Sequence, residues 1–503
     1  MANLIKKLAG ETAIYGLSTI LARMLNFLIV PLYTRVLATD NYGSYTEIMS
    51  YIAVLQVVLV LGLETGCFRF ATNGRGAQPS ASEPTQSASA EQLPFSTALF
   101  TVLSISLLFF GVLALFATPI SNAMGYEGYS KMVIYSGGIL ALDAICAILF
   151  ARLRFMQKAF KFAIFKTVKI VSELGFNLLL FFVVPAYLAA TPDSVLLNFI
   201  PATPDFSYII FAVFLSCAVC MLLFIPDLFR VGISMDKKLL KQMLVYSLPL
   251  MIAGLPGIIN ESLDRILFRF FAPENIDWRS DLGVYQAAVK LAVIMNLFVQ
   301  MFRYAAEPFF FSREKDKDSK ELYAKVMEYF VAFCMLIFLG IIAYMDIIGL
   351  ILGRDFRGAL DTVPFMLMSY MIVGVLFNVS MWYKLSGHTR YAINITLAGL
   401  AVTAVINILL MPRFSYWASV WAHVISGLVM LGYSLWLGNK YYPIPYNWKR
   451  TGSYVALGLG LFALFSCADK LLGSMVARIV LGTFMVLGYM AFVVLRNRDL
   501  LKR

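Results

Sequence analysis

Long apolar runs separated by short polar segments dominate the hydrophobic pattern of this chain. Most runs are about 20 residues long, the length that an α-helix needs to cross the ~30 Å hydrocarbon core of a bilayer. Outer-membrane barrels show alternating segments of ~10 residues instead. We therefore expect an all-α polytopic membrane protein with about fourteen transmembrane helices, at residues 12–34, 45–70, 95–117, 130–150, 163–184, 206–229, 243–271, 283–311, 326–350, 363–386, 391–411, 415–437, 452–469 and 475–495.

Composition and charge support this expectation. Of the 503 residues, 60% are hydrophobic and 14% are charged, whereas globular domains usually carry about 25% charged residues. A net charge of +12 can indicate nucleic-acid binding, but here the lysines and arginines gather in alternate inter-span loops. That distribution follows the positive-inside rule. It predicts no nucleic-acid partner, and it places both termini on the cytoplasmic side.

A weak internal repeat predicts two pseudo-symmetric six-helix lobes followed by a C-terminal helix pair. Arg35, Gly43, Tyr45 and Glu64 in the first two spans have counterparts in Arg269, Gly283, Tyr285 and Glu307 of spans 7 and 8. Repeated halves with a site between them are common among transporters. The predicted parts are an N-terminal lobe at 1–230, with a flexible cytoplasmic loop at 74–92, a C-terminal lobe at 231–440, and a helix pair with a basic tail at 441–503.

Charged residues inside the apolar runs are the most informative feature for function. Arg23 lies near the middle of the first span, and Asn26 shares its helical face at a spacing of three residues. A charge at this depth costs at least ~2.5–3.5 kcal/mol unless it faces protein or water. Arg265 and Lys290 lie in or near two later spans. Several embedded cations predict a polar, cationic cavity and the transport of an anion.

Spans 5 and 7 carry further polar faces. Lys169 and Glu173 are spaced for an ion pair within one helix. In span 7, Pro249 and Pro256 precede a polar segment that contains Asn260, Glu261, Asp264 and Arg265. Proline at these positions predicts a kink or break, which is typical of transporter sites. The alternative is that such charges only lock helices together or snorkel to the membrane surface.

No recognisable enzymatic or cofactor motif accompanies these spans. The sequence has no G-x-x-x-x-G-K-[ST], H-E-x-x-H or G-x-S-x-G motif, and its six cysteines fall in or beside apolar runs with only two histidines in the chain. We therefore expect no metal or organic cofactor and no enzymatic activity. A membrane glycosyltransferase, polymerase or ligase acting on lipid-linked glycans remains an alternative.

The N-terminal region resembles a known family. The segment KKLAGETAIYGLSTILARMLNFLIVPLYTRVLATDNYGSYTEIMSYIAVLQVVLVLGLETGCFRF has an amphipathic start, a span ending in P-L-Y-T-R-V-L, a turn with Y-G, and a second span ending in G-x-E-x-x-x-x-R. YSLPLMIAGLPGIINESLDRILFRFF and LGVYQAAVKLA extend the similarity into the second half. The pattern resembles Wzx-like O-antigen flippases of the multidrug/oligosaccharidyl-lipid/polysaccharide exporter superfamily.

This resemblance implies a V-shaped bundle of two lobes in the bacterial cytoplasmic (inner) membrane. It implies transfer of an undecaprenyl-pyrophosphate-linked oligosaccharide to the outer leaflet by alternating access, for polysaccharide or O-antigen biosynthesis, with coupling to a proton or sodium gradient. Expected partners are this lipid, membrane lipids, and the polysaccharide polymerase and chain-length machinery. A cation-coupled multidrug exporter of the same superfamily is the first alternative, although its substrates favour an acidic cavity.

Within this hypothesis each candidate residue has a role. Arg23, Arg265 and Lys290 would neutralise the pyrophosphate, because arginine and lysine bind phosphate groups well. Asn26 and Asn260 would contact sugar hydroxyls. Glu64, Asp264 and Glu307 would couple an ion gradient or balance the charge of the cavity.

Overall fold

The computed structural model is built from α-helices along the parts of the chain that it describes. Those parts are residues 21, 24–25, 27–76, 84–232, 234–314, 316–469 and 473–497, with the side chains of 73–76, 84–91 and 469 left out. No strand occurs within these ranges. Within these described ranges, thirteen helices are long and apolar enough to cross a membrane, and they coincide with the thirteen spans predicted after the first. Of the first predicted span, 12–34, the structure describes a short apolar helix at Phe27–Val36.

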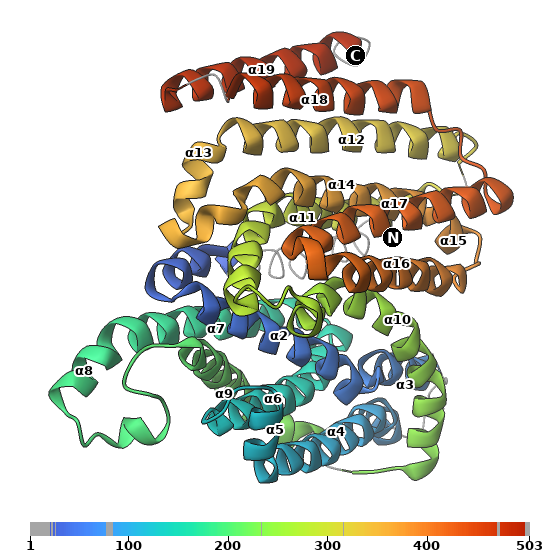
Figure 1. Ribbon diagram of the computed structural model, residues 1–503. Helices are drawn as coiled ribbons and strands as arrows, with labels where there is room; N and C mark the ends of the chain where they lie inside the picture. The colour runs from blue at the N-terminus through green and yellow to red at the C-terminus, as the bar shows by residue number, and fades with distance from the viewer. Residues whose placement is uncertain are drawn as a thin grey trace. The chain divides into compact units, whose positions relative to one another are not determined.

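Contacts group the chain into two compact units (Figure 1). Unit 1 contains Val36–Ile266, and unit 2 contains Val30–Arg35 and the chain from Leu267 onward. The sequence-based division begins the second lobe at residue 231, whereas these contacts place span 7 up to Ile266 with unit 1.

Unit 1 is assembled around one buried helix. Helix α6 is the most buried span of this unit, and it packs against α4 and α9 and also against α2 and α3. The elements of this part of the chain are α2 (Thr39–Val60), α3 (Leu63–Gly76), α4 (Pro84–Leu115), α5 (Ala117–Ala123), α6 (Ser130–Phe155), α7 (Ala159–Leu178), the π-helix η1 (Leu179–Val183), α8 (Val184–Ala190), the 3-10 helix η2 (Val195–Asn198), α9 (Phe206–Val231) and α10 (Lys237–Phe271).

Two local features of unit 1 shape its spans. The second predicted span is divided at Leu61 and Gly62, which both have positive φ, into α2 and α3. A side chain at Gly62 would place its Cβ 2.7 Å from the backbone oxygen of Ser247, so glycine permits the close approach of α10. Helix α10 itself continues through Pro249 and Pro256 as one helix. Of the predicted kink or break, the break does not occur, and Figure 1 shows α10 curving.

Unit 2 has a core of α11, α12 and α14, the spans most buried in this half of the chain. Helices α16 and α17 pack as a pair, and α18 and α19 both pack on α12. The elements of unit 2 are α11 (Trp278–Ser312), α12 (Ser319–Ala343), α13 (Met345–Ile348), the 3-10 helices η3 (Gly349–Ile351) and η4 (Arg354–Thr362), α14 (Val363–Val379), α15 (Met381–Leu385), α16 (Tyr391–Phe414), α17 (Tyr416–Tyr441), α18 (Trp448–Asp469) and α19 (Met475–Arg496).

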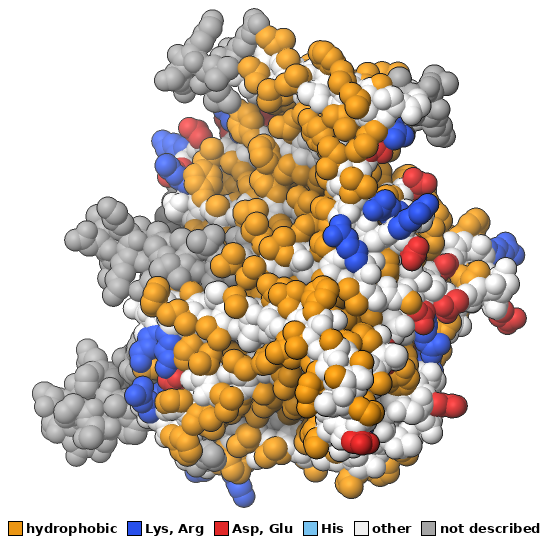
Figure 2. All heavy atoms as spheres, turned by 90° about the vertical axis from the view of Figure 1, so that its left-hand side faces the viewer, with side chains coloured by type: hydrophobic (Ala, Val, Ile, Leu, Met, Phe, Trp, Pro, Cys, Tyr) orange, Lys and Arg blue, Asp and Glu red, His pale blue; other side chains and the backbone are white. Residues whose placement is uncertain are grey.

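The surface is that of a protein that faces lipid. Leu108, Phe229, Val245 and Leu464 are all more than 60% exposed. Figure 2 shows hydrophobic side chains over much of the visible face, interrupted by small groups of charged side chains. Such extensive apolar exposure is unfavourable in water and is expected within a bilayer. The all-α membrane fold predicted from the hydrophobic pattern is therefore confirmed.

The helix at Phe27–Val36 ends against the loop that follows η3. The backbone N–H of Gly353 donates to the Thr34 hydroxyl at 3.1 Å, and Arg35 donates to the Leu350 carbonyl oxygen at 3.1 Å. A Cβ added to Gly353 would lie 1.7 Å from the backbone oxygen of Thr34. This contact leaves no room for a side chain.

We predict that Gly353→Ala destabilises the protein by about 2–3 kcal/mol, because backbone atoms must shift to admit the methyl group. Gly358→Ala on η4 is the matched control, since its Cβ would meet only Val284 at 3.6 Å. Denaturant unfolding in detergent micelles measures both variants. Equal stability of the two variants would show that the Gly353 contact is not tight.

Candidate functional site

The predicted site residues that the structure describes are divided between the two units. Arg23 and Asn26 lie outside the described residues. Glu64 on α3 and the α10 residues Asn260, Asp264 and Arg265 belong to unit 1, whereas Lys290 and Glu307 on α11 belong to unit 2. Within unit 1, the α10 residues lie on one helix within two turns. Lys290 is partly buried in the α11 helix of unit 2.

Arg265 faces protein within unit 1. Its side chain is partly buried and interacts electrostatically with Tyr42 and Tyr45 of α2. Its neighbour Asp264 is 1% exposed. A charged side chain that faces lipid at this depth would be costly, so the electrostatic interaction with the α2 tyrosines helps to explain how α10 can carry Arg265.

A second group of embedded charges lies where α6 and α7 meet. The Lys169 ammonium forms an ion pair with Asp143 of α6 at 2.6 Å. The sequence predicted Glu173 as its partner, but no ion pair between Lys169 and Glu173 is present among the described contacts. The neighbouring helix supplies the closer carboxylate, which helical spacing alone cannot reveal. Lys166, one turn away, lies over the ring of Phe150 at 4.6 Å.

These two groups form one polar layer in unit 1. Glu173 interacts electrostatically with Lys169 and Asp143, and Tyr45 interacts with both Glu173 and Arg265. We use the name polar layer for Asp143, Lys169, Glu173, Tyr45 and Arg265. Its members come from α6, α7, α2 and α10. The charged groups within these spans therefore interact with side chains of neighbouring helices.

Glu47 of α2 is a buried carboxylate that sequence reasoning did not select. It is 0% exposed, and it accepts hydrogen bonds from the Tyr126 hydroxyl at 2.5 Å and the Tyr51 hydroxyl at 3.3 Å. A carboxylate within the second predicted span was a possible signal. The aromatic donor from the loop after α5 is far away in sequence and could not be read from spacing.

Glu64 and Glu307 occupy matching positions in the predicted internal repeat. Each forms an ion pair with a basic side chain of another helix. Glu64 forms an ion pair with Arg154 of α6 at 3.0 Å, and Glu307 forms one with Lys384 of α15 at 2.6 Å. In both cases the base lies at the end of the helix two spans further along the chain. Arg303 adds a weaker contact to Glu307 at 4.0 Å. The two pairs therefore resemble one another in the type of partner and in its spacing along the chain.

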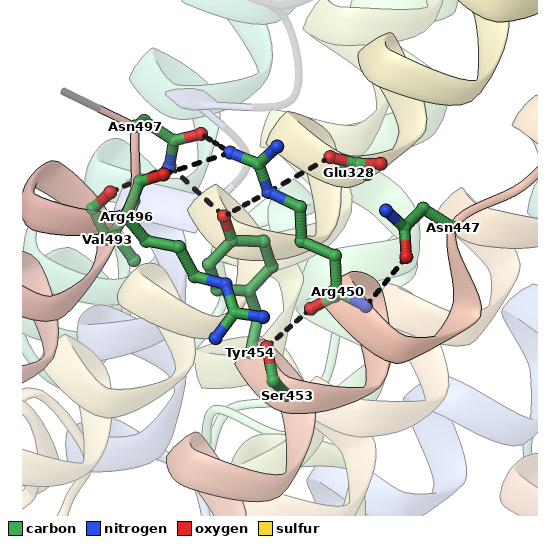
Figure 3. Close-up of polar contacts among 8 residues, drawn as sticks. All are labelled: Glu328, Asn447, Arg450, Ser453, Tyr454, Val493, Arg496 and Asn497. Carbon is green, nitrogen blue, oxygen red and sulfur yellow. Dashed lines mark hydrogen bonds and ion pairs between the residues drawn. The ribbon is translucent and has the colours of Figure 1, made fainter. Parts of the chain in front are cut away.

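The C-terminal helices are attached to α12 by a polar network (Figure 3). Glu328 of α12 is 5% exposed and pairs with the Arg450 guanidinium of α18 at 3.4 Å. Arg450 also donates to the backbone oxygen of Arg496 at 3.1 Å and to the Asn497 side chain. Asn497 donates in turn to the Tyr454 hydroxyl at 3.1 Å. These contacts hold α18 and α19 in unit 2 at the end where the basic residues gather.

Metal binding finds no support in the described part of the chain. No group of three or more His, Cys, Asp or Glu side chains is arranged there to hold an ion. The chemistry that the site residues offer is instead that of charged and hydroxyl groups in a low-dielectric setting, where paired charges interact strongly.

We predict that Lys169→Met lowers the free energy of unfolding by about 2 kcal/mol or more, because it leaves Asp143 without its cation. The double variant Asp143→Leu/Lys169→Met should recover most of this loss. Arg313→Met is the control, since it breaks a loop ion pair of 3.0 Å whose side chains are 55% and 50% exposed, and such pairs contribute little. Denaturant unfolding in micelles measures all three. Equal losses in Lys169→Met and Arg313→Met would contradict the assignment of a tightly held pair.

Comparison with solved structures shows the fold. The lipid II flippase MurJ in an inward closed conformation aligns with a TM-score of 0.71 at 12% identity, over 97% of this chain and 99% of that chain. An inward-facing multidrug resistance MATE family transporter of the MOP superfamily aligns with a TM-score of 0.58 at 13% identity, over 84% of this chain and 97% of that chain. The chain therefore has the helical fold that these two membrane proteins share.

Sequence comparison shows the family. No curated protein has significant sequence similarity to the chain. The family described as "Polysaccharide biosynthesis protein" matches residues 8–313, which is more than half of the chain. The protein is therefore a member of the polysaccharide biosynthesis protein family.

Proposed function

We propose that the protein is a flippase that moves a polyprenyl-pyrophosphate-linked oligosaccharide from the cytoplasmic to the outer leaflet. The observation that carries this proposal is the combination of polysaccharide biosynthesis family membership with a fold that follows a lipid II flippase over 97% of the chain. The product would serve polysaccharide or O-antigen biosynthesis in the bacterial inner membrane. Polymerase and chain-length proteins would act on the glycan after transfer.

The mechanism we propose is alternating access through a cationic cavity. Arg23, Arg265 and Lys290 would neutralise the pyrophosphate, and Asn26 and Asn260 would bind sugar hydroxyls. The electrostatic interactions of Arg265 within the polar layer support its part in this proposal, because they lower the cost of keeping a cation inside the membrane. A pyrophosphate carries several charges, so crossing the bilayer core without such compensation would be prohibitive.

Glu64, Asp264 and Glu307 are proposed to couple an ion gradient or to balance charge. The ion pairs of Glu64 and Glu307 favour charge balance for these two residues. Asp264, which is almost fully buried near the polar layer, is the stronger candidate for coupling to protons or sodium.

The test is leaflet exchange of a fluorescent undecaprenyl-pyrophosphate oligosaccharide in proteoliposomes. We expect protein-dependent exchange that Arg265→Ala slows by about tenfold or more, a loss of ~1.4 kcal/mol or more in transition-state stabilisation. Arg313→Ala, in an exposed loop ion pair, should exchange lipid at the wild-type rate.

Two outcomes of this experiment would contradict the proposal. Unchanged exchange in Arg265→Ala and Arg23→Ala at normal expression would exclude the cationic mechanism. A covalently altered lipid would indicate an enzyme instead. Exchange that responds to neither a proton nor a sodium gradient, and that is unaffected by Asp264→Asn, would exclude the coupling role.

A further inference from the structure

A pocket of about 330 Å³ lies within unit 2, at the opposite end of α12 and α18 from the Arg450 network. Its walls come from the end of α12 and from α13, from η4 and the start of α14, and from the second half of α18. The side chains that define its chemistry are Asp346, Asp361, Phe365, Phe462, Phe465 and Ser466. None of the residues proposed to bind the pyrophosphate belongs to it.

The aromatic walls of this pocket are fixed by contacts behind them. Phe462 meets the fully buried ring of Phe338 edge-on, with centroids 5.5 Å apart. Phe365 packs against Trp417 and Trp421 of α17, at 5.6 Å and 5.0 Å. Because neighbouring rings already hold them in place, these side chains would lose little conformational entropy when a ligand binds to their apolar surface.

The polar groups of the pocket include acceptors and a donor. Asp346 forms an ion pair with Arg478 of α19 at 2.9 Å, so this carboxylate is fixed in place and its charge is balanced. Asp361 is exposed, and no hydrogen bond or ion pair is found for it among the described residues. Ser466 adds a hydroxyl that can both donate and accept.

These features discriminate between ligand classes. The Asp361 carboxylate, whose charge no ion pair balances among the described residues, disfavours a phosphate or another anion. No cluster of three or more His, Cys, Asp or Glu side chains arranged to hold a metal ion is found among the described residues. A neutral ring with hydroxyl groups suits the pocket, because its hydroxyls can donate to the carboxylates while its C–H face packs on the phenyl rings. A volume near the lower end of the ~300–1,000 Å³ range of ligand sites fits one sugar ring.

We propose that this pocket binds one pyranose ring of a glycan at the face opposite the basic loops. The inference rests on the proposed function for the source of that sugar, namely the oligosaccharide delivered to the outer leaflet. Asp361 would accept hydrogen bonds from its hydroxyl groups, and Phe365 and Phe462 would contact its apolar face. The site would hold the glycan apart from the anionic carrier, which the Asp361 carboxylate repels.

The experiment is saturation-transfer NMR on the full-length protein in nanodiscs. The probes are the methyl glycosides of glucose, galactose, mannose, rhamnose and N-acetylglucosamine, with tetramethylammonium as a cationic comparison. We expect saturation of at least one glycoside. Asp361→Ala and Phe462→Leu should each weaken its binding by about fivefold or more, equivalent to a loss of ~1 kcal/mol.

Asp355→Ala is the matched control, because Asp355 is an exposed aspartate on the same helix η4 that lies outside the pocket. It should bind the glycoside as the wild type does, and melting temperatures verify that every variant is folded. Absence of saturation for all five glycosides would overturn the proposal. So would unchanged binding in Asp361→Ala, or binding of tetramethylammonium alone.

The outcome is separable from that of the flippase proposal. Lipid exchange in proteoliposomes without glycoside binding would refute the pocket and leave the flippase intact. Glycoside binding that depends on Asp361, without lipid exchange, would support the pocket and refute the flippase.

Discussion

The structure depends on how charged side chains are accommodated inside helices that must cross a bilayer. An unpaired charge at bilayer depth is costly, and yet α7 and α10 carry lysine, glutamate, aspartate and arginine within their spans. In unit 1 the cost is reduced by sharing these groups among helices. Lys169 of α7 pairs with Asp143 of α6, and Arg265 of α10 interacts with tyrosines of α2. The polar layer therefore gives these charged groups partners within unit 1.

Ion pairs also join helices within each unit. Glu64–Arg154 joins α3 to α6 in unit 1, while Glu307–Lys384 joins α11 to α15 in unit 2. The Arg450 network attaches the last two helices to α12. Partly exposed pairs add little stability individually, but a pairing defines the register of one helix against another. These contacts therefore help to define how the helices pack within each unit.

Helix positions were predictable from sequence, and side-chain partners were not. The thirteen later spans follow from hydrophobic length, because bilayer thickness imposes one scale on all of them. Helical spacing identified Lys169 as embedded but assigned it to Glu173, since periodicity describes one helix and not its neighbours. Glu47, bonded by Tyr126, was missed for the same reason. The prolines of α10 predicted a kink or a break, but the helix continues through both of them. Proline can be tolerated within a membrane span.

The central claim is that the embedded cations serve a pyrophosphate-bearing lipid. Native mass spectrometry of the purified protein with equimolar undecaprenyl pyrophosphate and undecaprenol tests it most directly, because the two lipids share the same isoprenoid chain and differ in the charged group. The account predicts that the pyrophosphate lipid is retained in preference by about tenfold or more, a difference of ~1.4 kcal/mol, and that Arg265→Ala reduces this preference. Equal retention of the two lipids would contradict it.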